Sequence, residues 1–425
     1  MSRSARFPQG TFALIATRLM FYLGVQAAYF IGIVGVLTYE LKASTMALAA
    51  AVGIFNLCII VANACGGTLL DVKGPRVHTA ATVAVVVASC LVYQIVEVSV
   101  VSVLAMSAAF GFSCGMGFPY LTAYPAYLTH RSGELQQVNA LLSVASNAAV
   151  AVGPAIGGII ASVFPAQRVF VFPAVLGVAA IVPAAALLKQ IAATGMRSLH
   201  GLEDASSVYV NEGMQGDAGE AAASVPTVEK GTFGDSVRTV MGSSVLSLLF
   251  WGGVLAYAGY GAFDPLESLY YRDVLHVGIA WMGWLSSAAG VGSFAGAMLS
   301  LRVPNSWVNV RTLLLLIALQ GAACLLYVGT PFVICALAGQ VLLGCAFGMI
   351  TPLQNTLVQM RAPKHLLGRV NSVMNAGFNG AGVIPLFAAP VLADMFGVQA
   401  VLLGASAFVL IVPIACLVLR RDASA

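Results

Sequence analysis

Long apolar runs alternate along the chain with short polar segments, and each run is about as long as a membrane is thick. A hydrocarbon core about 30 Å thick needs around 20 apolar residues of helix to cross it. Runs of this length lie near residues 11–39, 44–70, 77–97, 99–128, 138–163 and 167–188, and again near 242–270, 277–301, 311–328, 331–358, 368–393 and 396–419. The pattern predicts an all-α membrane protein with twelve transmembrane helices.

One polar stretch divides these runs into two sets of six. Residues 189–241 hold scattered acidic side chains among Ser, Gly and Ala, which is typical of a flexible linker rather than of a packed domain. We therefore expect an N-terminal six-helix bundle over residues 1–188, a cytoplasmic linker over 189–241 and a C-terminal six-helix bundle over 242–425.

The two sets share internal repeats. A Gly-Met pair followed by proline occurs in the fourth and in the tenth predicted helix, as Gly115, Met116 and Pro119 and as Gly348, Met349 and Pro352. Polar residues spaced four apart follow in the next helix of each set, as Asn139, Ser143 and Asn147 and as Asn371, Asn375 and Asn379. This spacing places each trio on one helix face. The matches lie 232–233 residues apart, which indicates two pseudo-symmetric bundles that arose by duplication.

The composition supports a membrane location. Hydrophobic residues make up 60% of the chain and charged residues only 8%, whereas soluble domains are roughly 25% charged. The formal net charge of +4 is too small to indicate a nucleic-acid partner. All 8 cysteines lie in apolar runs without metal-ligand spacing, so we expect no metal, no disulfide framework and no cofactor.

The distribution of Lys and Arg predicts the orientation. If the N-terminus is cytoplasmic, most basic residues fall on the inner side and only three in outer loops, which are Lys42, Arg168 and Arg272. The positive-inside rule then places both termini in the cytoplasm, in a multi-pass protein of the inner or plasma membrane. Arg3 and Arg6 precede an apolar run longer than a signal peptide, so we expect an uncleaved first helix.

The loop between the second and third predicted helices resembles the signature loop of the major facilitator superfamily. The matching positions are Gly67, Asp71, Gly74 and Arg76. The resemblance covers the chain apart from the linker, and it implies the major facilitator fold and secondary transport. We expect Asp71 to act as a conformational latch that accepts hydrogen bonds from a helix N-terminus, such as that of the eleventh helix. The alternative is a plain, positively charged turn.

The fifth predicted helix carries a second motif, which comprises Gly153, Pro154, Gly157 and Gly158. It is similar to the motif that marks exporters of the proton-antiport type within this superfamily, and the chain most resembles the macrolide- and siderophore-exporting branch. Ordinary packing of small residues between helices is the alternative. Many proton-coupled members carry an arginine in the fourth helix, but residues 100–128 contain no basic side chain, which leaves the coupling mechanism open.

Polar side chains within the apolar runs are candidate sites, because a polar group in lipid is costly unless it pairs or faces a cavity. The candidates for a substrate cavity are Gln26, Tyr29, Asn56, Asn63, Tyr120, Tyr124, Asn147, Tyr257, Tyr260, Gln354, Asn355, Asn375 and Asn379, with Gln340 as a further candidate. Amide groups that both donate and accept, beside aromatic rings, suit amphiphilic organic molecules. Polar contacts between packed helices are the alternative interpretation.

Three charged residues are candidates for coupling transport to an ion, namely Arg18, Asp264 and Glu267. Asp264 and Glu267 share one face of the seventh predicted helix, and Gly261 and Pro265 make that segment easy to kink. Counting along the helix places Asp264 near the outer boundary, so a hydrated outer vestibule is the alternative. Arg18 could neutralise an anionic substrate, or its side chain could extend to the cytoplasmic interface.

These features predict a secondary transporter rather than an enzyme. The sequence has no phosphate-binding Gly-x-x-x-x-Gly-Lys loop, so the energy must come from an ion or substrate gradient. We expect an exporter, as an antiporter, of drug- or metabolite-like amphiphilic small molecules that works by alternating access, with protons as the candidate coupling ion. An importer on the same fold and a non-transport membrane sensor are the alternatives. The expected partners are the substrate, protons and the lipid bilayer, without nucleic acid, and we expect a monomer.

Overall fold

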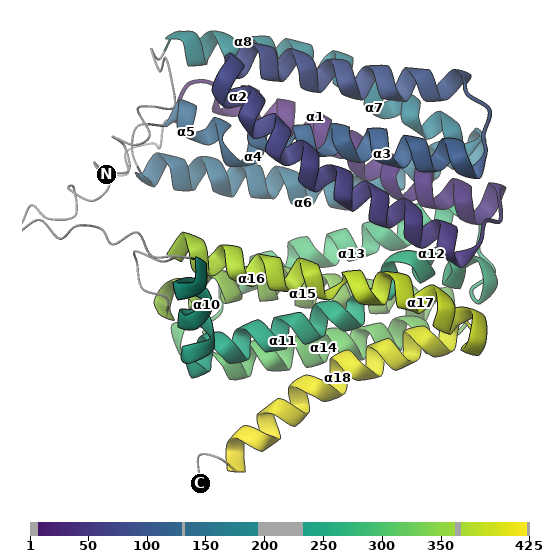
Figure 1. Cartoon of the computed structure of the whole chain (residues 1–425), viewed down its shortest axis with the longest axis vertical. Helices are drawn as coiled ribbons and strands as arrows, with labels where there is room; N and C mark the ends of the chain where they lie inside the picture. The colour runs from purple at the N-terminus through teal and green to yellow at the C-terminus, as the bar shows by residue number, and fades with distance from the viewer. Residues whose placement is uncertain (1–6, 130–131, 194–232, 362–366, 423–425) are drawn as a thin grey trace, which may run out of the picture.

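The structure is a computed structural model that describes residues 7–129, 132–193, 233–361 and 367–422. Within these ranges every regular element is a helix. The helices form two bundles, with α1 to α8 in one and α10 to α18 in the other (Figure 1). We call these bundles the N-half and the C-half. Most of the predicted linker, residues 194–232, lies outside the described residues.

The N-half begins with α1, which passes directly into the π-helix η1. Its elements are α1 (Thr11–Ala28), η1 (Tyr29–Glu40), α2 (Thr45–Ile95), α3 (Val100–Met116), α4 (Pro119–Thr122), α5 (Tyr124–Leu128), α6 (Ser132–Val163), η2 (Ala166–Phe170), α7 (Val171–Ala179) and α8 (Ile181–Ala193). The elements of the C-half are α10 (Phe233–Gly242), α11 (Ser244–Tyr260), α12 (Phe263–Asp273), α13 (Ile279–Ser300), η3 (Asn305–Trp307), α14 (Val310–Val328), α15 (Val333–Arg361), α16 (Leu367–Ala381), α17 (Val383–Phe396) and α18 (Val398–Asp422).

Ten helical stretches of the described chain are long and apolar enough to cross a membrane. One of them is α2, which is 51 residues long but is interrupted at Gly74. Gly74 has a φ of 81° and a ψ of 173°, a conformation that glycine adopts without steric cost and other residues do not. Pro75 follows it, and the chain turns there between two antiparallel helical segments.

Several helices begin at a capping residue that the sequence supplies. The N-cap side chains of α2, α3, α11 and α14 each accept a hydrogen bond from the backbone N–H three residues further on, and these residues are Ser44, Ser99, Ser243 and Asn309. Such a bond satisfies one of the backbone donors that a helix start leaves free, and it stabilises the helix by roughly 1 kcal/mol.

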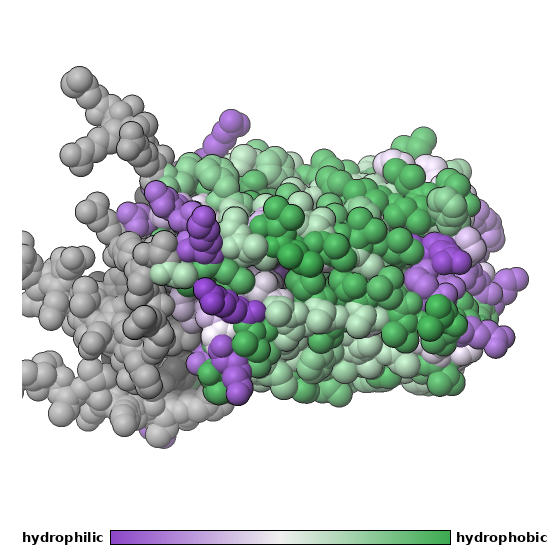
Figure 2. Space-filling view, turned by 90° about the horizontal axis from the view of Figure 1, so that it is seen from above, coloured by the Kyte–Doolittle hydropathy of each residue, from purple (hydrophilic) through white to green (hydrophobic). Residues whose placement is uncertain are grey.

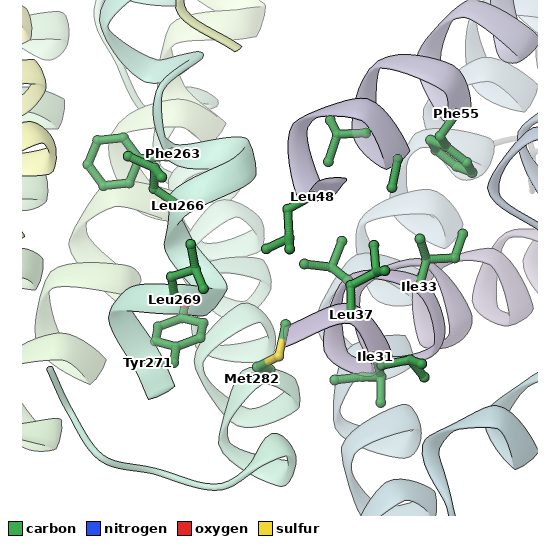
Figure 3. Packing of buried hydrophobic residues seen from close by; sticks show 14 of the residues in the cluster. Ile31, Ile33, Leu37, Leu48, Phe55, Phe263, Leu266, Leu269, Tyr271 and Met282 are labelled. Carbon is green, nitrogen blue, oxygen red and sulfur yellow. The ribbon is translucent and has the colours of Figure 1, made fainter. Parts of the chain in front are cut away.

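The buried apolar residues form three clusters, and their arrangement distinguishes the two ends of the molecule. The shared cluster joins both halves and includes Leu37 and Leu48 from the N-half and Leu266 and Met282 from the C-half (Figure 3). A second cluster is confined to the N-half and a third to the C-half. The chain enters α1 and α10 and leaves α8 and α18 at one end, which we call the terminal end (Figure 1). The shared cluster lies toward the opposite, distal end.

The outer surface fits a bilayer. Viewed from above, a broad apolar band lies between two polar ends (Figure 2). Large apolar side chains such as Leu57, Ile60, Val182 and Ile384 are exposed on the helices that form this band. So many exposed apolar side chains are unfavourable in water and favourable in lipid hydrocarbon. The band therefore marks the membrane-facing surface.

Candidate functional site

A break in the helical path between α11 and α12 gives the site its shape. At Gly261 the backbone of α17 comes so close that an added Cβ would lie 2.8 Å from the Gly382 carbonyl oxygen, so only glycine fits. The new helix α12 starts at Phe263, which places Asp264 in its first turn. The free N–H groups of a helix start favour a negative charge there. Pro265 is tolerated because it also lies in the first turn.

Glu267 lies one turn further along α12 and is held by three donors from three helices. Its Oε1 accepts hydrogen bonds from Tyr271 Oη at 2.7 Å, Tyr327 Oη at 2.9 Å and Gln340 Nε2 at 2.7 Å. Gln340 Nε2 also donates to Tyr271 Oη at 3.0 Å. Tyr271, Tyr327 and Gln340 form a cage around this oxygen and are themselves buried, whereas Glu267 is half-buried. Gln340 therefore binds Glu267 and does not line a cavity.

Asp264 has different surroundings. Its side chain is exposed although Phe263, Pro265 and Leu266 beside it are buried, and no described residue hydrogen-bonds to it. Tyr29 of the N-half lies near enough to interact electrostatically with it, so Asp264 lies close to the other half of the molecule. At 1.5 Å per residue it lies roughly 13 Å from the end of α12.

The two halves also meet through polar contacts beyond these carboxylates. Thr38 Oγ1 lies 2.8 Å from Ser268 Oγ, and Arg272 Nη1 donates to the Thr38 carbonyl oxygen at 2.7 Å. A carbonyl at the end of a helix carries partial negative charge and lacks an internal partner, so a guanidinium caps it well. Thr45 Oγ1 donates to Asp394 Oδ1 at 3.2 Å, which ties α2 to α17. The halves are thus joined by polar contacts as well as by the shared cluster.

Arg18 is buried rather than extended to the interface. It is 3% exposed, and its guanidinium carbon lies 4.3 Å from the centre of the Tyr22 ring. Its Nε has no hydrogen-bond partner in the described part of the chain, and no described acidic residue pairs with it. Of the two alternatives for Arg18, extension of its head group to the cytoplasmic interface is wrong, because so small an exposed fraction excludes hydration. Cation–π contact with Tyr22 partly replaces the missing water.

Tyr120 and Tyr124 do not line a cavity. They are 1% and 0% exposed and pack around His78 of α2. His78 Nε2 lies 3.0 Å from the carbonyl oxygen of Met116, where α3 ends. Pro119 interrupts the helix there, and His78 supplies a donor to a carbonyl that has lost its partner within the helix. The cavity prediction fails for both tyrosines because helical periodicity identifies a shared face but not what covers it.

The other cavity candidates divide by exposure. The exposed ones are Asn56, Asn63, Tyr257 and Asn355, and the half-buried ones are Gln26, Tyr29, Asn147, Tyr260 and Gln354. Tyr257, Tyr260 and Gln354 line one cavity of about 40 Å³ in the C-half, together with Gln320 and Thr351. That volume suits a water molecule rather than an organic substrate. The side chains of Asn375 and Asn379 lie outside the described residues.

The candidate latch lies at the terminal end, in the turn within α2. Asp71 is exposed there, and neither it nor Arg76 has a hydrogen-bond or ion-pair partner among the described residues. Gly67 has open space around it, whereas its neighbour Gly66 packs against the backbone of Met116. Close packing of α2 on α3 therefore rests on Gly66, and the turn itself rests on Gly74.

The glycines of the helix-five motif are positions of close helix contact. Gly153 and Gly157 of α6 face the backbone of α1 around Ala27. On the opposite side, Gly158 faces the backbone of α13 at Ala280 and Gly283. The motif thus lets α6 pack closely on its own half and on the other half at once. Small residues are typical of such contacts between membrane helices.

The family model described as Major Facilitator Superfamily matches residues 14–385 and 249–425, which together cover most of the chain. The chain belongs to the Major Facilitator Superfamily. As a member of this superfamily, the protein is a multi-pass membrane transporter and not an enzyme. Among the described residues, no three His, Cys, Asp or Glu side chains lie together as metal ligands would.

Relatives within the Major Facilitator Superfamily include efflux pumps. The chain is 27% identical to the multidrug efflux pump Tap of Mycolicibacterium fortuitum over 404 residues, which cover 90% of this chain and 88% of that protein. It is 30% identical to Tap of Mycobacterium tuberculosis over 337 residues, which cover 76% of this chain and 69% of the relative. The crystal structure of the peptide transporter POT in complex with sulfate superposes with a TM-score of 0.67 at 14% identity, covering 99% and 96% of the two chains. That likeness concerns the fold alone.

Several residues that the structure of this superfamily member brings together have no distinctive signal in the sequence. Tyr327 and His78 are separated by 60 and 46 residues from Glu267 and Tyr124, their respective partners. Thr38 and Ser268 lie in different halves. A polar residue in an apolar run was the only available signal, and Thr, Ser and Tyr are too common in such runs to stand out.

Proposed function

We propose that this protein exports amphiphilic small molecules across the plasma membrane by alternating access. The observation that carries the proposal is the similarity to multidrug efflux pumps over nearly the full length of both chains. The exposed and half-buried amide and tyrosine side chains on both halves support an amphiphilic substrate, because such groups bind polar atoms and apolar surface together. The glycine motif in α6 lies where the two halves meet, and its similarity to the exporter motif supports export.

We further propose twelve membrane spans with both termini in the cytoplasm. Ten stretches meet the length and composition of a span, and the second part of α2 and the 22-residue α13 would supply one more each. The positive-inside distribution of Lys and Arg supports this orientation. The domain boundaries at residues 188 and 242 and a monomeric state belong to the same proposal.

With this orientation, the described conformation faces the cytoplasm. The shared cluster and the Thr38, Ser268 and Arg272 contacts would close the outer side. At the inner side each half has its own cluster, and the exposed Asp71 has no described partner. In the outward-facing conformation we expect Asp71 to reach the start of α16, as a latch between the halves.

Proton coupling at Asp264 completes the proposal. Asp264 is an exposed carboxylate beside the other half of the molecule, and a site that is reached from alternate sides must lie where the halves meet. Uptake of a proton by Asp264 from outside and its release to the cytoplasm would drive substrate in the opposite direction.

Membrane vesicles of both orientations test the proposed direction. Everted and right-side-out vesicles receive a proton gradient and a panel of cationic, zwitterionic and neutral amphiphilic dyes. We expect gradient-dependent accumulation in everted vesicles, whose interior corresponds to the outside of the cell. Accumulation only in right-side-out vesicles would establish an importer and overturn the proposal.

A further inference from the structure

The small cavity of the C-half exists because α11 presents small residues toward α14 and α15. Gly253 and Ala256 line the cavity from α11, so no long side chain fills this space. The cavity of about 40 Å³ is too small for a whole organic molecule. A water-sized group needs about 10–15 Å³, so roughly three heavy atoms fit. The cavity therefore has the size of a short end group of a larger molecule.

Gln320 is a buried amide without a partner in the described part of the protein. It lies on α14, is 7% exposed and lines the cavity. Its side chain makes no hydrogen bond with any described residue. Buried amides almost always have a hydrogen-bond partner, so the partner of Gln320 must lie in the cavity itself. An amide in this position is available to a group that enters the cavity.

Three further polar side chains line the same cavity and are also unpaired among the described residues. Gln354 comes from α15, and Tyr257 and Tyr260 come from α11. Each tyrosine ring stacks on a phenylalanine ring at 5.5 Å between the ring centroids. Because this stacking fixes the rings without using their hydroxyl groups, the hydroxyl groups stay free for a ligand. We call the cavity with these three residues and Gln320 the polar recess.

The polar recess lies beside the space between the halves. Tyr257 is 38% exposed, so the recess is not sealed inside the C-half. Tyr260 lies near enough to Tyr257 and to Asp264 to interact electrostatically with both. Asp264, which does not line the recess, lies close to Tyr29 of the N-half. A molecule held between the halves can therefore insert one end into the recess.

The lining of the polar recess favours an uncharged group. None of the described side chains that line it is charged. A charged group that entered the recess would lose water without gaining an opposite charge, which is costly. Glutamine amides and tyrosine hydroxyls both donate and accept hydrogen bonds, so the lining pairs well with a group that also does both. A carboxamide, with three heavy atoms, meets both the size and the chemistry of the recess.

We propose that the polar recess binds an uncharged end group of the transported molecule, of the carboxamide class, and that Gln320 selects it. This proposal rests on the proposed function and specifies the substrate class of that site. The amide nitrogen of Gln320 donates to the carbonyl oxygen of the end group, and the amide oxygen of Gln320 accepts its N–H. The apolar body of the molecule stays between the two halves, beside the ring of Tyr257. Gln320 is thus a specificity-determining residue.

A matched series of probes tests this preference on the purified full chain in lipid nanodiscs. Three probes share one aromatic fluorophore and end in a carboxamide, in a carboxylate of the same shape or in an isopropyl group of similar size. Fluorescence anisotropy measures the affinity of each probe without a gradient, and empty nanodiscs measure its partitioning into lipid. We expect the carboxamide-ended probe to bind roughly tenfold more tightly than either of the others, as expected for one well-made hydrogen bond.

Two glutamine variants of the C-half assign the preference to the recess. Gln320→Leu keeps a similar side-chain volume and removes the amide, so the preference for carboxamide over isopropyl should fall roughly tenfold. The melting temperature of the empty protein should not fall, because this amide has no described protein partner to lose. Gln399→Leu is the control, because the Gln399 amide donates to the Val328 carbonyl oxygen at 2.9 Å and does not line the recess. It should lower the melting temperature and leave the preference unchanged.

Three results would overturn the proposal. Equal binding of the three probes would show that the recess holds water only. Tighter binding of the carboxylate-ended probe would show that the site selects a charge. Equal loss of the carboxamide preference in Gln320→Leu and Gln399→Leu would show that Gln320 acts only through stability. The binding measurements do not depend on the direction of transport, so the proposed export is tested separately in the membrane vesicles.

Discussion

At the scale of single residues, the partners of a polar side chain say more about its role than its chemical identity does. Asp264 and Glu267 have the same functional group, but only one of them is caged. Arg18 is a cation without a described acidic partner. His78 donates a hydrogen bond to the carbonyl oxygen of Met116, where α3 ends. In lipid each of these arrangements is costly unless it serves packing or function.

Asp264→Asn is the residue-scale prediction. The amide cannot bind a proton at physiological pH, so we expect gradient-driven transport to be lost while exchange of substrate across the membrane persists. Dye transport in everted vesicles, with and without a proton gradient, measures both processes. Glu97→Gln is the control, because Glu97 is exposed in the loop before α3, and it should leave both unchanged. Driven transport at the normal rate in Asp264→Asn would exclude coupling at this residue.

Some residues of the site could be predicted from the sequence, whereas their partners could not, because these come from distant helices. Asp264 and Glu267 stand out because charges are rare in apolar runs. The Glu267 cage could not be predicted, because Tyr327 and Gln340 come from helices 60 and 73 residues away. Tyr120 and Tyr124 carry the same sequence signal as Tyr257, yet they are buried and Tyr257 is 38% exposed. Periodicity does not say which neighbour covers a helix face.

At the scale of elements, glycine and proline determine where the helices bend. The break in α2 follows from Gly74 and Pro75, and the break between α11 and α12 follows from Gly261. The sequence predicts both, because these residues disfavour a continuous helix. The π-helix η1 was not predictable, since Tyr29–Glu40 is an apolar run without an unusual residue pattern.

Gly74→Ala tests the turn in α2. Gly74 has a positive φ that alanine adopts only under strain, so we expect a loss of roughly 1–3 kcal/mol in the free energy of unfolding. Gly67→Ala is the control in the same segment, because both positions have open space but Gly67 lies in regular helix. Thermal unfolding in detergent compares the two variants. Equal stability of the two variants would show that the turn does not depend on the positive φ of Gly74.

Gly283→Ala tests the contact between α6 and α13. An added methyl group would meet the backbone of Pro154 and Gly158, so the two helices must separate. Overpacking of this kind costs roughly 1–3 kcal/mol. Gly404→Ala in α18 is the control, because nothing lies within 4 Å of its added methyl group. We expect lower thermal stability only for Gly283→Ala. Equal melting temperatures of the two variants would exclude close packing of α6 on α13.

At the scale of the whole molecule, cross-linking tests alternating access. Thr38 and Ser268 are joined across the halves by oxygen atoms 2.8 Å apart. In a background without the 8 native cysteines, the Thr38→Cys, Ser268→Cys pair should cross-link under oxidation and block transport. The Ser89→Cys, Ser113→Cys pair is the control, because those oxygen atoms lie 3.3 Å apart within one half. Transport that continues at full rate in the cross-linked Thr38–Ser268 variant would contradict separation of the halves at the distal end.

The shared cluster also has a consequence for the resting state of the transporter. Opening the distal end exposes Leu37, Leu48, Leu266 and Met282, and each Å² of apolar surface exposed to water costs about 25 cal/mol. The separate clusters of the two halves impose no comparable cost on opening the terminal end. An empty transporter should therefore rest facing the side of its termini. An amphiphilic molecule bound between the halves would lower the barrier to the opposite state, because its apolar part covers the surface that opening exposes.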